Sequence, residues 1–184
     1  MKKLGLIALF LLFSIVAFSQ KTKDPVEVTV AIEKKIASDI AKEADVLKAK
    51  LIKDNDHEYS IEFELDTFRV HRYMQLYINY DWTTAGMRMA TYEAAAKYDS
   101  LLNKYYKRLM DVLKPEDKKA LIAAQKAWLT FRDNERKLID VIGKDEYSGG
   151  GTIQQLIDAS EYLDLIEKRT ITLFQHYMRA TQSY

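Results

Sequence analysis

Apolar side chains recur every three or four positions along most of the chain, which is the period of an amphipathic helix. After Pro25, one such row falls on a single helical face: Ile32, Ile36, Ile40, Leu47 and Leu51. Asp24 and Pro25 suit the N-cap and the first position of a helix, so we expect this helix to begin near Pro25. The charged residues 53–57 predict its end.

Residues 60–81 are rich in aromatic side chains and are also predicted to be helical. A short alternating run at residues 61–65 also suits a strand. The helical spacing of Leu65, Phe68 and Leu76, and the lack of a second candidate strand nearby, favour a helix. Residues 81–86 predict a break, in which Thr83 or Thr84 can cap the next helix, and helical spacing continues over residues 87–113.

Pro115 opens the next predicted helix, because proline suits the first helical position and two acidic residues follow it. Its apolar seam alternates spacings of three and four, which is typical of a helix packed lengthwise on another: Leu121, Ala124, Trp128, Phe131, Glu135, Leu138 and Ile142. Gly143 ends this helix, residues 144–151 form a loop, and a last helix follows from Thr152. The pattern predicts an all-α fold, an antiparallel helical bundle of about four helices with short connections.

The first nineteen residues follow a different pattern. Lys2 and Lys3 precede an apolar run that ends in a small-x-small site at residues 17–19. We therefore predict a signal peptide over residues 1–19, cleaved before Gln20, and a periplasmic or secreted protein. The alternative, a membrane anchor, is disfavoured because the run is shorter than the roughly 20 residues of a spanning helix. Because the chain has no cysteine, it also lacks a site for a lipid anchor.

Charge and residue usage argue against several classes of function. The chain has 28 basic and 27 acidic residues, so no strong field steers it to nucleic acid, and we expect no nucleic-acid partner. His57, His71 and His176 lie far apart and form no metal-binding pair on one helical face. No Gly-x-Ser-x-Gly elbow or cysteine nucleophile is present. We predict a protein that is not an enzyme and that needs no cofactor or metal.

Several polar residues interrupt the apolar rows of two neighbouring helices: Asp99, Asn103, Gln125, Arg132 and Arg136. A polar group that points inward costs on the order of a few kcal/mol unless it is hydrogen-bonded. These residues therefore either bond to one another across the helix pair, which we favour, or form an exposed functional edge.

The same residues carry a resemblance to a known family. The relevant blocks are Tyr98-Asp99-x-x-Leu102-Asn103-x-x-Tyr106, Ala124-Gln125-x-Ala127-Trp128-x-x-Phe131-Arg132-Asp133, Gly149-Gly150 and Arg169-Thr170. Together they resemble the LprI-type family of small exported helical domains, named for a lipoprotein that inhibits vertebrate-type lysozyme. The resemblance covers about residues 83–175. It implies a family-motif network made of Asp99, Asn103, Tyr106, Gln125, Trp128, Arg132 and Asp133.

The resemblance also implies a domain organisation and one departure from the family. Residues 83–181 would form the LprI-like helical domain, and residues 20–82 an N-terminal helical segment packed with it as one unit. Relatives carry cysteine where this chain has Ala90, Arg136 and Glu161. Because the last two of these residues have opposite charges, we expect an ion pair between Arg136 and Glu161 in place of a disulfide.

The function implied by the resemblance is non-catalytic inhibition of lysozyme or of a related wall-degrading enzyme. Asp145, Glu146 and Tyr147 form the candidate partner-binding loop, because they offer acids to a cationic partner and an aromatic anchor. The alternative for this loop is a plain connection between helices. A second hypothesis is an envelope structural or assembly protein that uses exposed aromatic side chains of residues 59–82. The sequence leaves the oligomeric state open.

Overall fold

The computed structural model describes residues 24–54 and 57–181, so the predicted signal peptide over residues 1–19 lies outside the described residues. All regular structure in the described residues is helical, which confirms the predicted all-α class. The helices are α1 (Val30–Lys53), α2 (Glu58–Tyr80), α3 (Thr84–Val112), α4 (Pro115–Ile142), the short α5 (Asp145–Ser148) and α6 (Thr152–Thr181). The described residues thus form five long helices and a single turn, more than the four or so that we expected.

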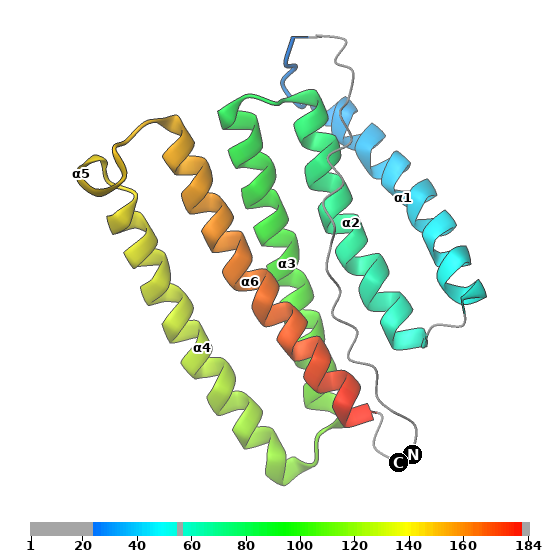
Figure 1. Cartoon of the computed structure of the whole chain (residues 1–184). Helices are drawn as coiled ribbons and strands as arrows, with labels where there is room; N and C mark the ends of the chain where they lie inside the picture. Colours follow the sequence, from blue (N-terminus) through cyan, green and yellow to red (C-terminus); the bar gives the residue numbers. More distant parts are fainter. Residues whose placement is uncertain (1–23, 55–56, 182–184) are drawn as a thin grey trace.

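The long helices lie side by side, and helices that follow one another along the chain run antiparallel (Figure 1). α1 packs on α2, and α2 packs on α3. α6 then returns to α3, and these two helices make the most extensive contact between the described helices, while α4 contacts α6. Because α4 runs back between them in sequence, α3 and α6 run parallel to each other (Figure 1).

The hydrophobic core lies between α2, α3 and α6. Small buried residues on the two parallel helices, Ala94 and Ala159 among them, allow close approach of the backbones. Aromatic side chains fill the space toward α2: Phe63 stacks on Phe174 with ring centroids 3.8 Å apart and meets Tyr105 edge-on at 5.2 Å. Much of the aromatic surplus of residues 59–82 is therefore packed inside, although Trp82 remains 55% exposed.

The first helix begins later than the sequence predicted. α1 starts at Val30, with the side chain of Thr29 accepting a hydrogen bond from the Ile32 amide at 3.4 Å. The segment before it is not helical, because the Val26 amide donates to the Tyr80 carbonyl at 2.8 Å and ties the chain to the end of α2. Pro25 therefore precedes the helix instead of opening it.

The other predicted helix ends agree more closely with the structure. The hydroxyl of Thr83 accepts a hydrogen bond from the Gly86 amide at 3.0 Å and caps α3. Pro115 is the first residue of α4, and Gly143 follows its last residue. The predicted loop at residues 144–151 contains the turn of α5, so it is more ordered than expected. No helix within the described residues has the length and apolarity of a membrane span.

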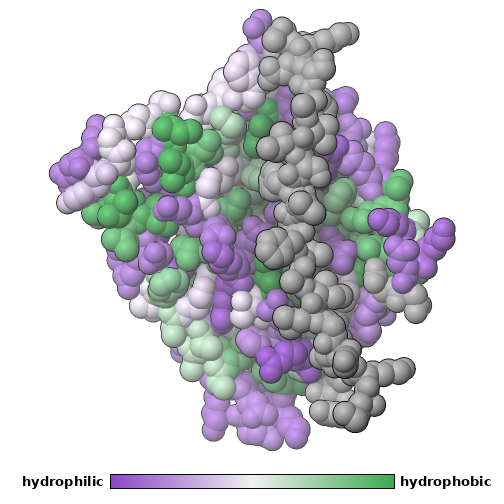
Figure 2. Space-filling model, in the orientation of Figure 1, coloured by the Kyte–Doolittle hydropathy of each residue, from purple (hydrophilic) through white to green (hydrophobic). Residues whose placement is uncertain are grey.

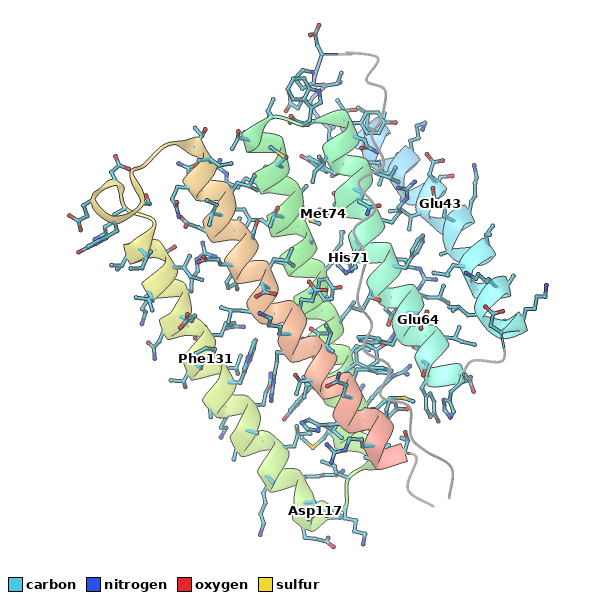
Figure 3. All side chains as sticks on the ribbon, in the orientation of Figure 1. Glu43, Glu64, His71, Met74, Asp117 and Phe131 are labelled. Atoms are coloured by element: carbon cyan, nitrogen blue, oxygen red, sulfur yellow. The ribbon has the colours of Figure 1, made fainter. Side chains whose placement is uncertain are left out.

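The seam of α4 differs from its prediction in burial. Leu121 is buried, but Phe131, Leu138 and Ile142 are 50–51% exposed, and Figure 3 marks Phe131 on this helix. We expected the whole seam to pack against a neighbour. α4 meets mainly α6 and lacks a close neighbour on its other side in the described chain, so part of the apolar stripe faces solvent.

Candidate functional site

Most of the family-motif residues lie where α4 packs beside α6 and α3. Gln125 is buried, and its side-chain oxygen accepts hydrogen bonds from Nε and Nη2 of Arg169 at 3.1 and 2.9 Å. The ring of Trp128 lies beside two guanidinium groups, with that of Arg132 at 5.5 Å and that of Arg169 at 5.8 Å from its centroid. Gln125 and Trp128 thus connect α4 to α6 through hydrogen bonds and cation–π contacts.

The same network continues to α3 through Arg132. Its guanidinium lies 3.7 Å from the carboxylate of Asp99 and donates to Asp133 at 2.8 Å. Asn103 donates to the Asp99 carbonyl one turn away at 2.9 Å. Tyr106 packs against the hydrophobic core instead of joining this chain of polar contacts. The structure therefore brings six of the seven family-motif residues together and places Tyr106 in a packing position.

Arg136 does not pair with Glu161 in the described residues. Its Nε donates to Asp140, one turn along the same helix, at 3.2 Å. Its guanidinium lies over the ring of Tyr162 on α6, 4.6 Å from the centroid, and near Tyr92 on α3. Tyr162 faces α4, and adjacent helical residues point about 100° apart. The preceding residue, Glu161, therefore points elsewhere and is exposed. α4 and α6 therefore meet at this level through an arginine–aromatic contact.

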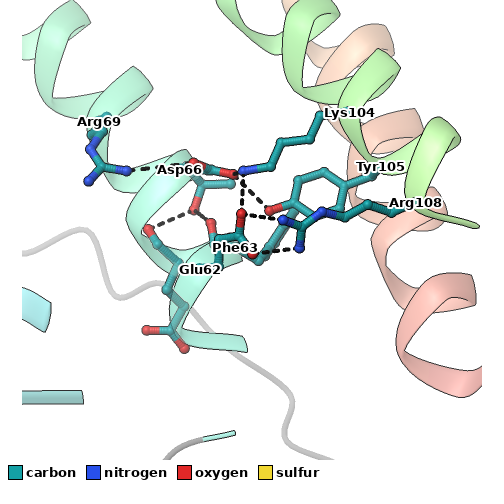
Figure 4. Close-up of polar contacts among 9 residues, drawn as sticks. Glu62, Phe63, Asp66, Arg69, Lys104, Tyr105 and Arg108 are labelled. Carbon is teal, nitrogen blue, oxygen red and sulfur yellow. Dashed lines mark hydrogen bonds and ion pairs between the residues drawn. The ribbon is translucent and has the colours of Figure 1, made fainter. Parts of the chain in front are cut away.

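A second polar network, not anticipated from the sequence, joins α2 to α3 (Figure 4). The carboxylate of Glu62 accepts from both terminal nitrogens of Arg108 and lies 2.7 Å from the ammonium of Lys104. Lys104 also pairs with Asp66, which accepts a hydrogen bond from the Tyr105 hydroxyl at 2.8 Å. Burial opposes ionisation of Glu62, but the bonds from Lys104 and Arg108 outweigh it and lower its pKa. Partners 38 to 46 positions apart leave no signal in local spacing.

A third cluster joins α2, α3 and α6. The hydroxyl of Tyr98 lies 2.7 Å from Nε2 of His71 and donates to Glu167 at 3.1 Å. Figure 3 shows His71 on the side of α2 that faces α3. The hydrogen bond from His71 lowers the pKa of Glu167 despite burial, and burial next to the Glu167 charge raises the pKa of Tyr98. Tyr98 is fully covered by its neighbours, which suits a bond that holds three helices together.

The candidate partner-binding residues lie on α5, at the far end of α4. Asp145, Glu146 and Tyr147 are exposed, and Tyr147 is exposed over 62% of its surface. Gly150 has a φ of 74°, and a β-carbon there would lie 2.6 Å from the Asp145 carboxylate, so glycine allows the chain to turn tightly around this residue. The turn presents the tyrosine and both acids on one short segment.

Exposed apolar side chains surround this turn. They lie on the end of α4, on α5 and on the first two turns of α6: Leu138, Val141, Ile142, Tyr147, Ile153 and Ile157. We call these six residues the tip patch. Figure 2 shows apolar atoms gathered where α4 ends and α6 begins. An exposed cluster of this kind marks a site of protein association more often than isolated exposed residues do.

The tip patch and its flanking acids form a surface that a partner can contact. No group of three or more potential metal ligands among His, Asp and Glu lies together in the described part of the chain. The polar clusters are paired internally, and the apolar side chains of the tip patch are exposed beside the carboxylates of Asp145 and Glu146. Such a surface can hold a partner by burial of apolar area and by charge.

Comparison with known proteins agrees with the sequence resemblance. The family model described as "Lysozyme inhibitor LprI" matches residues 79–173, which is more than half of the 184 residues. The matched region begins at the end of α2 and includes α3, α4, α5 and most of α6, with the family-motif network and the tip patch. No curated protein and no solved structure matches the chain. The chain belongs to the LprI family.

Proposed function

We propose that this protein is exported and inhibits a lysozyme or a related wall-degrading enzyme without catalysing a reaction itself. The family match supports inhibition as the type of activity. The tip patch, which lies within the matched residues, is the observation that supports a particular surface for this inhibition. Its apolar side chains are exposed, so they add little to the stability of the monomer and remain available to a partner.

The charge around the tip patch suits a cationic enzyme. Asp140, at the end of α4, is paired with Arg136, so the exposed Asp145 and Glu146 of α5 are the carboxylates that remain for such a partner. Carboxylates at the rim of an apolar contact speed association with a cationic partner and fix its orientation. Tyr147 is the proposed anchor, because a tyrosine buries a large ring and keeps a hydroxyl for a hydrogen bond.

The competing hypothesis was an envelope structural or assembly protein that uses the aromatic side chains of residues 59–82. Those side chains support it less, because Phe63 is stacked in the core and Tyr59 packs against Tyr177. We also propose that residues 20–82 and 83–181 form one folded unit. Val70 of α2 shares a single hydrophobic cluster with Tyr98 of α3 and Leu173 of α6, which supports this proposal.

A lysis assay tests the proposed inhibition. Purified protein is added to a vertebrate-type lysozyme acting on bacterial cells, and the fall in turbidity is followed. We expect saturable inhibition, and we expect Tyr147→Ala to weaken it by about thirtyfold, which corresponds to the roughly 2 kcal/mol of an interface anchor. The matched control is Trp82→Ala, which removes a similarly exposed ring from the α2–α3 connection and should leave inhibition unchanged.

Two results would count against the proposal in different ways. Unchanged lysis at excess protein would contradict inhibition of this enzyme class. Inhibition that survives Tyr147→Ala, or that falls equally with Trp82→Ala, would retain the activity but move it away from the tip patch.

A further inference from the structure

A groove lies between the end of α3, the beginning of α4 and the end of α6, at the opposite end of α4 from the tip patch. Its volume is about 470 Å³, within the range of roughly 300–1,000 Å³ that is usual for small-molecule sites. Seven of its ten lining residues are leucine or alanine, including Leu109, Leu121 and Leu173. The other three are Arg169, His176 and Arg179. The groove is therefore an aliphatic surface with basic side chains and no acidic one.

Arg169 is the cation that distinguishes this groove. Its Nε and Nη2 both donate to the neutral side-chain oxygen of Gln125, and no carboxylate among the described residues forms an ion pair with it. Arg132 of α4, which lies beside the same Trp128 ring, has two acidic partners, Asp99 and Asp133. Burial alone acts on Arg169 and lowers its pKa. A partly buried guanidinium that lacks an anion is stabilised when an anion binds beside it.

The lining also restricts the remainder of the ligand. None of the ten lining side chains carries a carboxylate, amide or hydroxyl group. The ring of His176 is the one lining side chain that can accept a hydrogen bond, so a peptide or a sugar in this groove would leave most of its donors without side-chain acceptors, which is costly away from water. An alkyl chain has no such groups. From Arg169 to Ala180, α6 rises about 16 Å at roughly 1.5 Å per residue, a length comparable with an extended dodecanoate chain.

We propose that this groove binds a fatty-acid anion, with the carboxylate on the Arg169 guanidinium and the alkyl chain along the leucine and alanine wall. Arginine has five N–H donors, and two are used by Gln125, so three remain for a carboxylate. The bound chain would cover Leu121 and Ala124 of α4 and Leu173 of α6. The site is separate from the tip patch, so it does not depend on lysozyme inhibition.

The test is a titration of the purified protein with laurate below its micelle concentration, by calorimetry and by tryptophan fluorescence. Trp128 lies beside Arg169 and serves as the reporter in a Trp82→Phe background. We expect saturable binding of one laurate. Decanoate, two methylene groups shorter, should bind about fifteenfold more weakly, since each fully buried methylene is worth about fourfold. Dodecyltrimethylammonium, which has the same chain and the opposite charge, should not bind.

Substitutions then place the ligand. Ala124→Phe fills the groove at an exposed position and should weaken laurate binding at least about tenfold. Ala123→Phe adds the same ring at the adjacent exposed position, which does not line the groove, and should leave binding unchanged. Arg169→Gln should abolish the preference for the anionic head group and keep the dependence on chain length.

Several outcomes would overturn the proposal. One is the absence of saturable laurate binding up to about 1 mM, where the binding free energy is only about −4 kcal/mol. Equal binding of laurate and of the cationic detergent would indicate unspecific apolar adsorption. Equal effects of Ala124→Phe and Ala123→Phe would place the ligand elsewhere, and thermal melts of both variants would show whether each is folded.

Discussion

Buried side-chain polar atoms of the described residues all have hydrogen-bond partners, and several of these partners lie on another helix. Thr170 is fully buried, and its hydroxyl contacts the carbonyl of Ile166 at 2.9 Å and that of Tyr98 at 3.2 Å. Tyr98 in turn reaches His71 and Glu167. Because an unpaired polar group would cost more than an apolar replacement, such contacts select one arrangement of α2, α3 and α6.

Removal of the Tyr98 hydroxyl tests whether these polar contacts stabilise the packing of α2, α3 and α6. Tyr98→Phe keeps the ring and leaves Glu167 with one donor fewer, so the free energy of unfolding should fall by about 1–3 kcal/mol. Urea denaturation followed by circular dichroism measures the change. The matched control is Tyr106→Phe, because the Tyr106 ring packs on the same core and no hydrogen bond of its hydroxyl is found in the described residues. Equal stability of the two variants would contradict the role given to Tyr98.

Among the helices, α4 differs most from a buried element. Its N-terminal half packs through Leu121 and Gln125, and near its end Ile139 is buried. Between and beyond these residues, Phe131, Leu138 and Ile142 are about half exposed. The exposed residues lead at one end to the tip patch, while Ala120 and Ala124 line the groove at the other. A helix with one close neighbour has apolar surface left for binding.

Two leucines on α4 should therefore differ sharply in their contribution to stability. Leu121→Ala removes a buried side chain and should lower the free energy of unfolding by about 2–5 kcal/mol. Leu138→Ala changes a half-exposed position and should cost less than about 1 kcal/mol. Chemical denaturation of both variants gives the comparison. A loss at Leu138 as large as that at Leu121 would mean that α4 packs along its whole seam.

At the scale of the whole molecule, α2, α3 and α6 form the centre of the described residues, and α1 and α4 form the flanks. α2, α3 and α6 share the main hydrophobic cluster, with Leu121 contributed by α4. α1 is attached to α2 by its own apolar row and by the ion pair between Glu43 and Arg72, and α4 is attached to α6. The two proposed binding surfaces both use the less covered flank at α4.

Hydrogen exchange should reveal this arrangement. Amides of α3 and α6 should be the most protected, because their opening requires disruption of the central core. Amides of α4 should exchange faster, since this helix can separate from α6 while α2, α3 and α6 remain packed. Mass spectrometry of peptides from each helix provides the measurement. Protection of α4 equal to that of α3 would instead indicate that all helices open together.

Much of the helical structure was predictable from the sequence for local physical reasons. Backbone hydrogen bonds in a helix join residues four apart, so the period of apolar residues and the ends at Thr83, Pro115 and Gly143 are encoded nearby. The predicted start of α1 was wrong because a contact between distant residues decides it. A hydrogen bond from Val26 to Tyr80, more than fifty positions away, holds the segment around Pro25 outside the helix.

The sequence by itself determined the helical class, most helix ends, the motif residues that identify the family, and the polar residues that had to find partners. Only the tertiary structure decided which side chains on other helices those partners are. It placed the Arg136 guanidinium over the Tyr162 ring, bonded Arg169 to a neutral glutamine, and left half of the α4 seam exposed. The reason is that local spacing states which face of a helix is apolar, whereas the packing of distant helices decides how much of that face is covered.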